Sequence, residues 1–310
     1  LAASEGVNLT IVGPEVPLVA GIVDHFAMRG LPCFGPRKAP AQLEGSKAFT
    51  KEFLVRHGIP TAGYRKFTRD NFDREWLASQ KTPSVVKASG LAAGKGVIIA
   101  QSAAEAVDAA ESMLQGRFGN AGDEIVIEEF LEGEEASFIV MCDGTHVVPM
   151  ASSQDHKRLR DADEGPNTGG MGAYSPAPVV TPVVHERIMR EVIEPTVRGL
   201  AADGMPFTGF LYAGLMIGKD GSVKTVEFNC RLGDPETQPI MMRLKSDLLD
   251  LLDHAVAGRL NLVEASWDRR IALGVVLAAA HYPDTPRTGD LISGLPPASD
   301  DSHVFHAGTA

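Results

Sequence analysis

Polar and apolar residues alternate in the stretch Val226–Arg231, and this pattern predicts a strand with two different faces. Because successive side chains of a strand point to opposite sides, Glu227, Asn229 and Arg231 should share one face. Carboxylate and amide oxygens are ligands that Mg²⁺ accepts, usually together with nucleotide phosphates, and an arginine can bind a phosphate or a carboxylate. The simpler alternative is an edge strand with a solvated polar face. The acid-bearing turn Gly-Asp-Pro-Glu at 233–236 favours the functional interpretation.

The first part of the chain has the pattern of a parallel α/β unit. Residues 9–12 and 31–34 are short apolar runs, and Leu18, Ile22 and Phe26 recur between them at helical spacing. This strand–helix–strand order predicts a parallel pair, in which ligands gather at the carboxyl ends of the strands.

The remaining pattern predicts a mixed α/β chain with several hairpins. We expect strands at 84–87, 97–100, 124–130, 137–141, 146–151, 210–217, 223–229 and 304–306, and a further β-rich part that begins with residues 271–280. We expect helices from a Ser46 cap to Val55, from a Ser102 cap to Leu114, from Thr181 to Gly204 with a kink at Pro195, and from a Ser246 cap to Gly258.

Composition is that of a globular protein without a basic footprint. The 310 residues are 44% hydrophobic and 22% charged, and the net charge is −11, which argues against a general nucleic-acid binder. Cys33, Cys142 and Cys230 form no CxxC pair, as expected of a reduced, cytoplasmic protein. There is no signal peptide and no apolar run of membrane-spanning length. The chain starts without Met, and both ends read as cuts through a longer protein.

A glycine-rich loop lies between two predicted strands at residues 87–96, which read Lys-Ala-Ser-Gly-Leu-Ala-Ala-Gly-Lys-Gly. Small residues let backbone N–H groups approach an anion, and the lysines add positive charge. The P-loop spacing is not met, because Gly96 follows Lys95 and a strand comes next. A plain hairpin turn is the alternative, and Lys87 at the end of the preceding strand favours anion binding.

Two further segments carry polar groups. Residues 128–135 have the arrangement of a nucleotide hinge, where backbone groups read adenine and a glutamate accepts ribose hydroxyls; a charged surface turn is the alternative. Residues 153–158 and 166–172 offer an acid, an imidazole, two cations and a glycine-rich backbone. We interpret His156 as structural, since metal-ligand spacing and a hydrolase nucleophile are both absent from the sequence.

Taken together, these residues resemble the ATP-grasp superfamily and, within it, the glycinamide ribonucleotide synthetase (phosphoribosylamine–glycine ligase) family of purine biosynthesis. The matching stretches follow the family's order over nearly the whole chain: GPEVPLVAGIVD, CFGP, QLEGSKAFTKEF, GLAAGKGV, IEEFLEGEEASFIVM, SQDHKR, GPNTGGMGAYSPAPVVT, TGFLYAGLMI and VEFNCRLGDPETQPIMMR.

The resemblance implies a role for each residue that matches a family motif. ATP would be bound by Lys47, Lys87, Gly94, Lys95, Gly96, Glu128, Glu129, Leu131 and Glu135, of which Glu128 and the backbone of Glu129 and Leu131 would hold adenine and Glu135 the ribose. The metal, Mg²⁺ or Mn²⁺, would be held by Glu227 and Asn229. The catalytic residues would be Arg231, Asp155 and Lys157. The substrates would be bound by Glu15, Asn167, Thr168, Gly169 and Gly170, with Glu15 near the phosphoribosylamine.

The implied reaction joins glycine to 5-phosphoribosylamine with ATP, through glycyl phosphate, and needs no protein nucleophile. The resemblance also implies a monomer whose partners are small molecules, with neither nucleic acid nor membrane. The domains would be a Rossmann-like remnant at 1–45, a connecting helix at 46–61, an ATP-grasp lid at 62–127, the main ATP-grasp part at 128–262 and an incomplete C-terminal domain at 263–310. The alternatives are another ATP-grasp carboxylate–amine ligase and an ATP-binding fragment without turnover.

The chain departs from the family pattern at a few positions. Ser89 stands where the family usually has Asp, and Arg160 and Ala162 replace glycines, so the loop after SQDHKR should be stiffer. Ala213 is apolar where many other ATP-grasp enzymes carry a metal-binding carboxylate, as is usual in this branch. The family's first strand and glycine-rich phosphate loop would precede Leu1, and on this basis we expect them to be missing.

Overall fold

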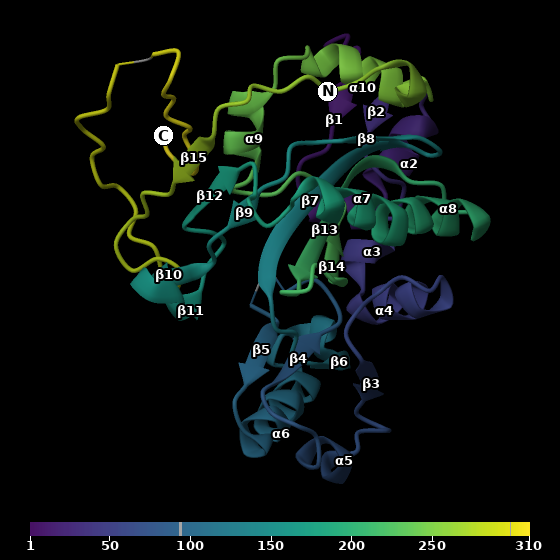
Figure 1. The fold of residues 1–310 in the computed structure, drawn as a ribbon, viewed down its shortest axis with the longest axis vertical. Helices are drawn as coiled ribbons and strands as arrows, with labels where there is room; N and C mark the ends of the chain where they lie inside the picture. Colours follow the sequence, from purple (N-terminus) through teal and green to yellow (C-terminus); the bar gives the residue numbers. More distant parts are fainter. Residues whose placement is uncertain (93–94, 298) are drawn as a thin grey trace.

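A computed structural model describes residues 1–92, 95–297 and 299–310, and it has an α/β fold built from several sheets (Figure 1). The strands are β1 (Thr10–Ile11), β2 (Cys33–Phe34), β3 (Tyr64–Thr68), β4 (Ser84–Ala88), β5 (Val97–Ala100), β6 (Glu124–Glu129), β7 (Glu134–Asp143), β8 (Val147–Pro149), β9 (Gln154–Asp155), β10 (Arg158–Arg160), β11 (Glu164–Asn167), β12 (Gly172–Ser175), β13 (Thr208–Ile217), β14 (Val223–Asn229) and β15 (Ala272–Val275). The α-helices are α1 (Glu15–Ala20), α2 (Ile22–Ala27), α3 (Gln42–Gly45), α4 (Lys47–Arg56), α5 (Arg74–Ala78), α6 (Ala103–Ser112), α7 (Pro182–Ile188), α8 (Glu194–Ala202), α9 (Thr237–Arg243) and α10 (Leu248–Val256).

A four-stranded antiparallel sheet in the order β14-β13-β7-β8 forms the centre of the molecule. Both faces of this sheet are apolar, because successive residues of β7 point to opposite sides and pack in two different hydrophobic cores. Phe138 and Val140 pack in one core with residues of α4, α7 and α8, whereas Ile139 and Met141 pack in another with residues of α9 and α10. The sheet is therefore covered on both sides, and its strand ends remain as places for a site.

The N-terminal unit has the predicted parallel pair. Thr10 lies opposite Cys33, and β1 and β2 run in the same direction. The predicted helix between them is interrupted at Gly21, whose φ of 94° lies in the left-handed region that glycine adopts easily. Apolar spacing alone does not reveal this break, because Leu18 and Ile22 on either side of it still face the core.

A second antiparallel sheet has the strand order β3-β6-β4-β5, and α5 and α6 pack on it. In Figure 1 it lies below the central sheet, coloured blue. The strand predicted at 97–100 has those same bounds, and Ser102 caps α6 by accepting a hydrogen bond from the backbone N–H of Glu105 at 3.2 Å. The expected border between residues 127 and 128 falls inside β6, because Glu128 and Glu129 still pair with β3 and β4.

The helix predicted from Thr181 to Gly204 changes its winding before Pro195. Thr181 caps α7, a π-helical turn follows at Met189–Ile193, and α8 then begins with Pro195 in its first turn. The residues before Pro195 keep helical dihedral angles, with Ile193 at φ −68° and ψ −56°, so Pro195 lies inside a continuous helix and removes one backbone hydrogen-bond donor from it. The structure has a π turn directly before the proline at which the sequence predicts a kink.

The C-terminal part has less regular structure than the sequence predicts. Of residues 271–280 only Ala272–Val275 forms a strand, β15, which pairs with β12, and the strand predicted at 304–306 is wrong. The predicted Ser246 cap is also wrong. Asp247 caps α10 by accepting from the backbone N–H of Leu249 at 2.8 Å, while the Ser246 hydroxyl accepts from the backbone N–H of Ser266 at 2.8 Å.

The loop after SQDHKR, which the sequence predicts to be stiffer, forms the turn of the β10–β11 hairpin. Its connection, Asp161–Asp163, holds Ala162 at φ 58°, a conformation that costs an L-residue about 1–2 kcal/mol.

We expect Ala162→Gly to raise the free energy of unfolding by about 1 kcal/mol, measured by thermal or urea unfolding. The control is Ala104→Gly at an exposed position of α6, which should lower stability because glycine weakens helices. A loss of stability in Ala162→Gly would contradict this account of the turn.

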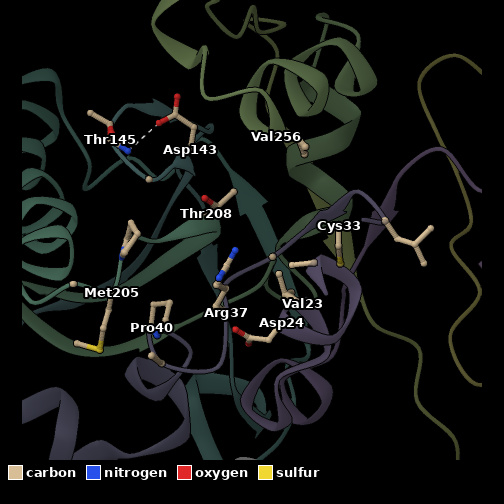
Figure 2. Close-up of a pocket in the computed structure, with 17 residues that line it drawn as sticks. Val23, Asp24, Cys33, Arg37, Pro40, Asp143, Thr145, Met205, Thr208 and Val256 are labelled. Atoms are coloured by element: carbon tan, nitrogen blue, oxygen red, sulfur yellow. Dashed lines mark hydrogen bonds between the residues drawn. The ribbon is translucent and has the colours of Figure 1, made fainter. Parts of the chain in front are cut away.

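A cavity of about 800 Å³ opens between α2, the end of β2 and the turn after β7 (Figure 2). Arg37, Asp24 and Cys33 lie on one side of it, and Asp143 and Met205 on the other. It contains none of the residues that the sequence assigns to a site.

In the described part of the chain, no helix has both the length and the apolarity needed to cross a bilayer.

Candidate active site

The end of β14 carries the predicted polar face, and a β-bulge directs it. The pairing with β13 shifts by one residue at Val226, so this residue is extra in the strand. Before the bulge Thr225 is buried, and after it Phe228 is buried. Glu227 and Asn229 therefore alternate with the buried residues and lie on the face opposite to them.

Glu227 is surrounded by positive charge. Burial alone would raise the pKa of its carboxyl, but Lys157, Lys87, Lys47 and Arg231 lower that pKa, and the net result is a pKa below the ordinary value. The carboxylate is therefore ionised at neutral pH. Four cations therefore act on one carboxylate, and such a gathering of lysine and arginine side chains is what a site for a polyanion such as a nucleoside triphosphate requires.

Lys47 and Lys87 meet where α4 begins and β4 ends. The Lys47 ammonium lies 3.5 Å from the carbonyl oxygen of Gly90, and its backbone N–H donates to Ser89 at 2.8 Å. The hydroxyl of Ser89, where the resemblance leads us to expect Asp, accepts from the backbone N–H of Ala48 at 3.1 Å. The serine thus accepts a hydrogen bond from the first turn of α4, and it does so without the negative charge of an aspartate.

Glu128 is buried between two lysines. Its Oε1 lies 2.9 Å from the Lys87 ammonium, and its Oε2 lies 2.9 Å from the Lys51 ammonium. Sequence reasoning missed Lys51, although it lies one helical turn after Lys47 and so on the same face of α4. Burial lowers the pKa of Lys51 to about 8, against the pull of Glu128 in the other direction.

The other residues of this region that the sequence assigns to ATP binding are Glu129, Leu131 and Glu135. Glu129 is exposed and accepts from the Lys224 ammonium at 2.8 Å and from the backbone N–H of Gly63 at 3.0 Å. Leu131 follows β6 and is partly buried. Glu135 on β7 accepts from the Lys157 ammonium at 3.2 Å.

Part of the glycine-rich loop is described. Gly96 accepts the backbone N–H of Ala88 at 2.8 Å, and a Cβ at Gly96 would lie only 2.7 Å from Cβ of Ala92. Lys95 is exposed. Gly94, which the sequence assigns to ATP binding, lies outside the described residues.

A small pocket joins Asp155, Lys157, Glu135 and Glu227 between β7, β9, β13 and β14. Burial raises the pKa of Asp155 to about 6, and Glu236 adds to that rise while Lys157 opposes it. Burial alone would lower the pKa of the Lys157 ammonium, but the carboxylates around it raise that pKa above the ordinary value. Both groups are therefore charged at pH 7.

Glu236 belongs to a buried hydrogen-bonded cluster beneath the pocket. Its Oε1 accepts from the Tyr212 hydroxyl at 2.6 Å and from the Ser137 hydroxyl at 2.9 Å. Sequence reasoning saw Glu236 only as part of an acid-bearing turn. Its fixed position sustains the negative potential at Asp155.

The loop at 167–170 closes on the backbone of Lys157. Thr168 donates to the Lys157 carbonyl oxygen from its backbone N–H at 2.7 Å and from its hydroxyl at 2.9 Å. Gly169 donates its N–H to the Tyr282 hydroxyl at 2.9 Å. Gly170 has φ 134°, and a Cβ there would lie 2.3 Å from the ring of Pro235, so only glycine fits. Asn167, at the end of β11, is exposed.

Arg231 lies just beyond β14 and is held by two carboxylates. Its guanidinium approaches Glu15 Oε2 at 3.6 Å and Glu44 Oε1 at 3.3 Å. Glu44 was missed from the sequence. It is buried, and its other oxygen accepts from the backbone N–H of Cys230 at 2.7 Å. Glu15 and Arg231, which the sequence placed at the substrate, are thus neighbours.

The donor set at β14 fits Mg²⁺ or Mn²⁺. Across residues 1–92, 95–297 and 299–310 there is no cluster of three or more His, Cys, Asp or Glu that could bind a metal by itself. Glu227 and Asn229 supply an ionised carboxylate and an amide oxygen, and magnesium in nucleotide sites needs few protein ligands because phosphates and water complete its shell.

Comparison with known proteins gives consistent matches. Residues 1–44 match the family model described as phosphoribosylglycinamide synthetase, N domain, and residues 45–237 match the ATP-grasp (A) domain of the same enzyme. The phosphoribosylamine–glycine ligases of Ralstonia nicotianae and Allochromatium vinosum are 62% and 64% identical, and each match covers 99% of this chain and 73% or 72% of the relative. The crystal structure of the phosphoribosylamine–glycine ligase of Thermotoga maritima has a TM-score of 0.78 at 36% identity, over 86% of this chain and 67% of that one.

Proposed function

Because this chain belongs to the phosphoribosylglycinamide synthetase family of ATP-grasp ligases, we propose that its site joins glycine to 5-phosphoribosylamine, giving glycinamide ribonucleotide, ADP and phosphate. The observation that supports this most directly is the gathering of Lys47, Lys87, Lys157 and Arg231 around the ionised Glu227. A ligase that forms an acyl phosphate needs such a cluster, since charge develops on the phosphate while it transfers.

On the ATP side, Lys47 and Lys87 would contact the phosphates, with Lys95 and Gly96 of the glycine-rich loop above them. The proposed adenine contacts are the hinge backbone at Glu129 and Leu131, together with Glu128, whose side chain also balances the buried lysines. Glu135 would accept the ribose hydroxyls. It can do so while paired with Lys157, because a carboxylate has about four acceptor positions.

On the acceptor side, a glycine carboxylate oxygen would bond to the γ-phosphorus as the bond to the β–γ bridging oxygen breaks, releasing ADP. The amine nitrogen of phosphoribosylamine would then bond to the acyl carbon, phosphate would leave, and the nitrogen would lose a proton. Arg231 and Lys157 would bind the transferring phosphate, and Asp155 would receive the proton. Its pKa of about 6 suits a base at neutral pH.

The loop Asn167–Gly170 would enclose the acceptor, and Glu15 would lie near phosphoribosylamine beside Arg231. Glu227 and Asn229 would hold Mg²⁺ or Mn²⁺, which supplies positive charge to the ATP phosphates when bound. No described side chain needs to act as a nucleophile in this scheme.

The proposed domains follow the sheets. A Rossmann-like remnant spans 1–45, a connecting helix 46–61, the lid 62–129, the main ATP-grasp part continues to 262, and the start of a further domain follows. The lid sheet would close over the phosphates and exclude water, which would otherwise hydrolyse the acyl phosphate. The monomeric state stays a prediction.

Oxygen transfer tests the proposed acyl phosphate. With glycine labelled by ¹⁸O in its carboxylate, together with MgATP and phosphoribosylamine, the released phosphate should contain one ¹⁸O atom by mass spectrometry. The label reaches phosphate only if the glycine oxygen has bonded to phosphorus. Unlabelled phosphate, released with formation of the amide product, would exclude this intermediate.

A further inference from the structure

Lys51, Glu128 and Lys87 form a buried charged network, and Lys51 is the member of it that has no role in the proposed reaction. All three side chains are at most 5% exposed, and the two ion pairs measure 2.9 Å each. They come from α4, β6 and β4, so the network joins the connecting helix to the lid sheet. Glu128 has one negative charge and two ammonium groups bound to it.

The same lysines are also fixed to β14. Lys51 donates to the Thr61 hydroxyl at 2.7 Å, and that hydroxyl donates to the carbonyl oxygen of Thr225 at 2.7 Å. Lys87 donates to the carbonyl oxygen of the next residue, Val226, at 3.4 Å. Both contacts therefore lie directly before Glu227, where the proposed metal site begins.

The charge balance of this network depends on whether Lys87 binds phosphate. A buried carboxylate without a cation is strongly unfavourable. If Lys87 turned to the ATP phosphates in a chain without Lys51, Glu128 would be left unpaired, and its charge would also repel the nucleotide. With Lys51 present, Glu128 keeps a partner at 2.9 Å and Lys87 is free to change partners.

Resting on the function proposed above, we propose that Lys51 is a positioning residue for ATP: it retains the Glu128 carboxylate so that the Lys87 ammonium can pass from Glu128 to the nucleotide phosphates. Lys51 itself touches neither phosphate nor acceptor. Its effect should therefore appear in nucleotide affinity rather than in the rate of the bound complex, and should depend on the charge of Glu128.

The test is a double-mutant cycle with Lys51→Met and Glu128→Gln, in which the Kd of the Mg²⁺ complex of the β,γ-imido analogue of ATP is measured by calorimetry. We expect Lys51→Met to raise this Kd at least tenfold when Glu128 is present and less than threefold in the Glu128→Gln background. At saturating ATP, kcat of Lys51→Met should stay within threefold of wild type. Lys66→Met, at an exposed lysine paired with Glu52 and Glu124 on the surface, is the control and should leave Kd unchanged.

An equal effect of Lys51→Met on Kd in both backgrounds, including no effect in either, would overturn the proposal, because the proposed effect requires the charge of Glu128. If Lys51→Met alone does not fold, the Glu128→Gln background remains a test, since a tenfold change caused by Lys51→Met in that background would overturn the proposal. Because Kd is measured without turnover, failure of the ligase assay would leave this result interpretable.

Discussion

Replacing Glu227 with glutamine is expected to lower kcat by about 1,000-fold, the size of effect seen when one electrostatic contact to a transferring group is removed. The carboxylate is the anion on which four cations converge, and their attraction keeps it ionised. Glutamine has nearly the same volume but no charge, so it would weaken metal binding and leave the cations unbalanced. Steady-state release of phosphate, with glycine and phosphoribosylamine both present, measures the effect.

The matched control for Glu227→Gln is Glu134→Gln. Glu134 is an exposed carboxylate at the start of β7, outside the cation cluster, so its loss should leave kcat unchanged. Unfolding curves of both variants would show that the fold is retained. A Glu227→Gln enzyme with kcat within tenfold of wild type would contradict the role given to this residue.

Replacing Arg231 with lysine should lower kcat by about 100-fold while the KM for ATP changes little. The guanidinium reaches Glu15 and Glu44 at once and keeps further N–H donors for a phosphate oxygen. A lysine ammonium is a single point charge on a flexible chain and cannot make these contacts together. Steady-state kinetics with each substrate varied in turn separates the two parameters.

Arg190→Lys on the surface of the π turn is the control for Arg231→Lys, since Arg190 is exposed and its guanidinium pairs with the neighbouring Glu191. We expect its kinetic parameters to equal those of wild type. A rise in the KM for ATP without loss of kcat in Arg231→Lys would place this arginine on the nucleotide side and refute the assignment to the acceptor side.

Local signals in the sequence predicted much of the fold. The Ser46 hydroxyl caps α4 as expected, accepting from the backbone N–H of Phe49 at 3.2 Å, and the hairpin turn at Asp220-Gly221 joins β13 to β14. Such features depend on residues close together in the chain. The same reasoning failed where two adjacent residues could both cap a helix, as Ser246 and Asp247 can.

Features set by distant contacts could not be predicted. The bulge at Val226 depends on how β14 pairs with β13, and alternation alone cannot show where an extra residue enters. The ion pair of Lys51 and Glu128 joins residues that are 77 positions apart in the sequence. Glu44 reaches Arg231 because α3 packs beside β14. The sequence therefore identified residues that match family motifs and missed the buried charges that hold them.

The most direct test of the central claim is phosphate release from MgATP by this chain, with glycine and freshly prepared phosphoribosylamine added separately and together. The account predicts release that requires both substrates, because the amine must displace phosphate from glycyl phosphate. Release at the same rate without phosphoribosylamine, or no release from a chain that binds ATP, would contradict the proposal that this site performs the complete ligation.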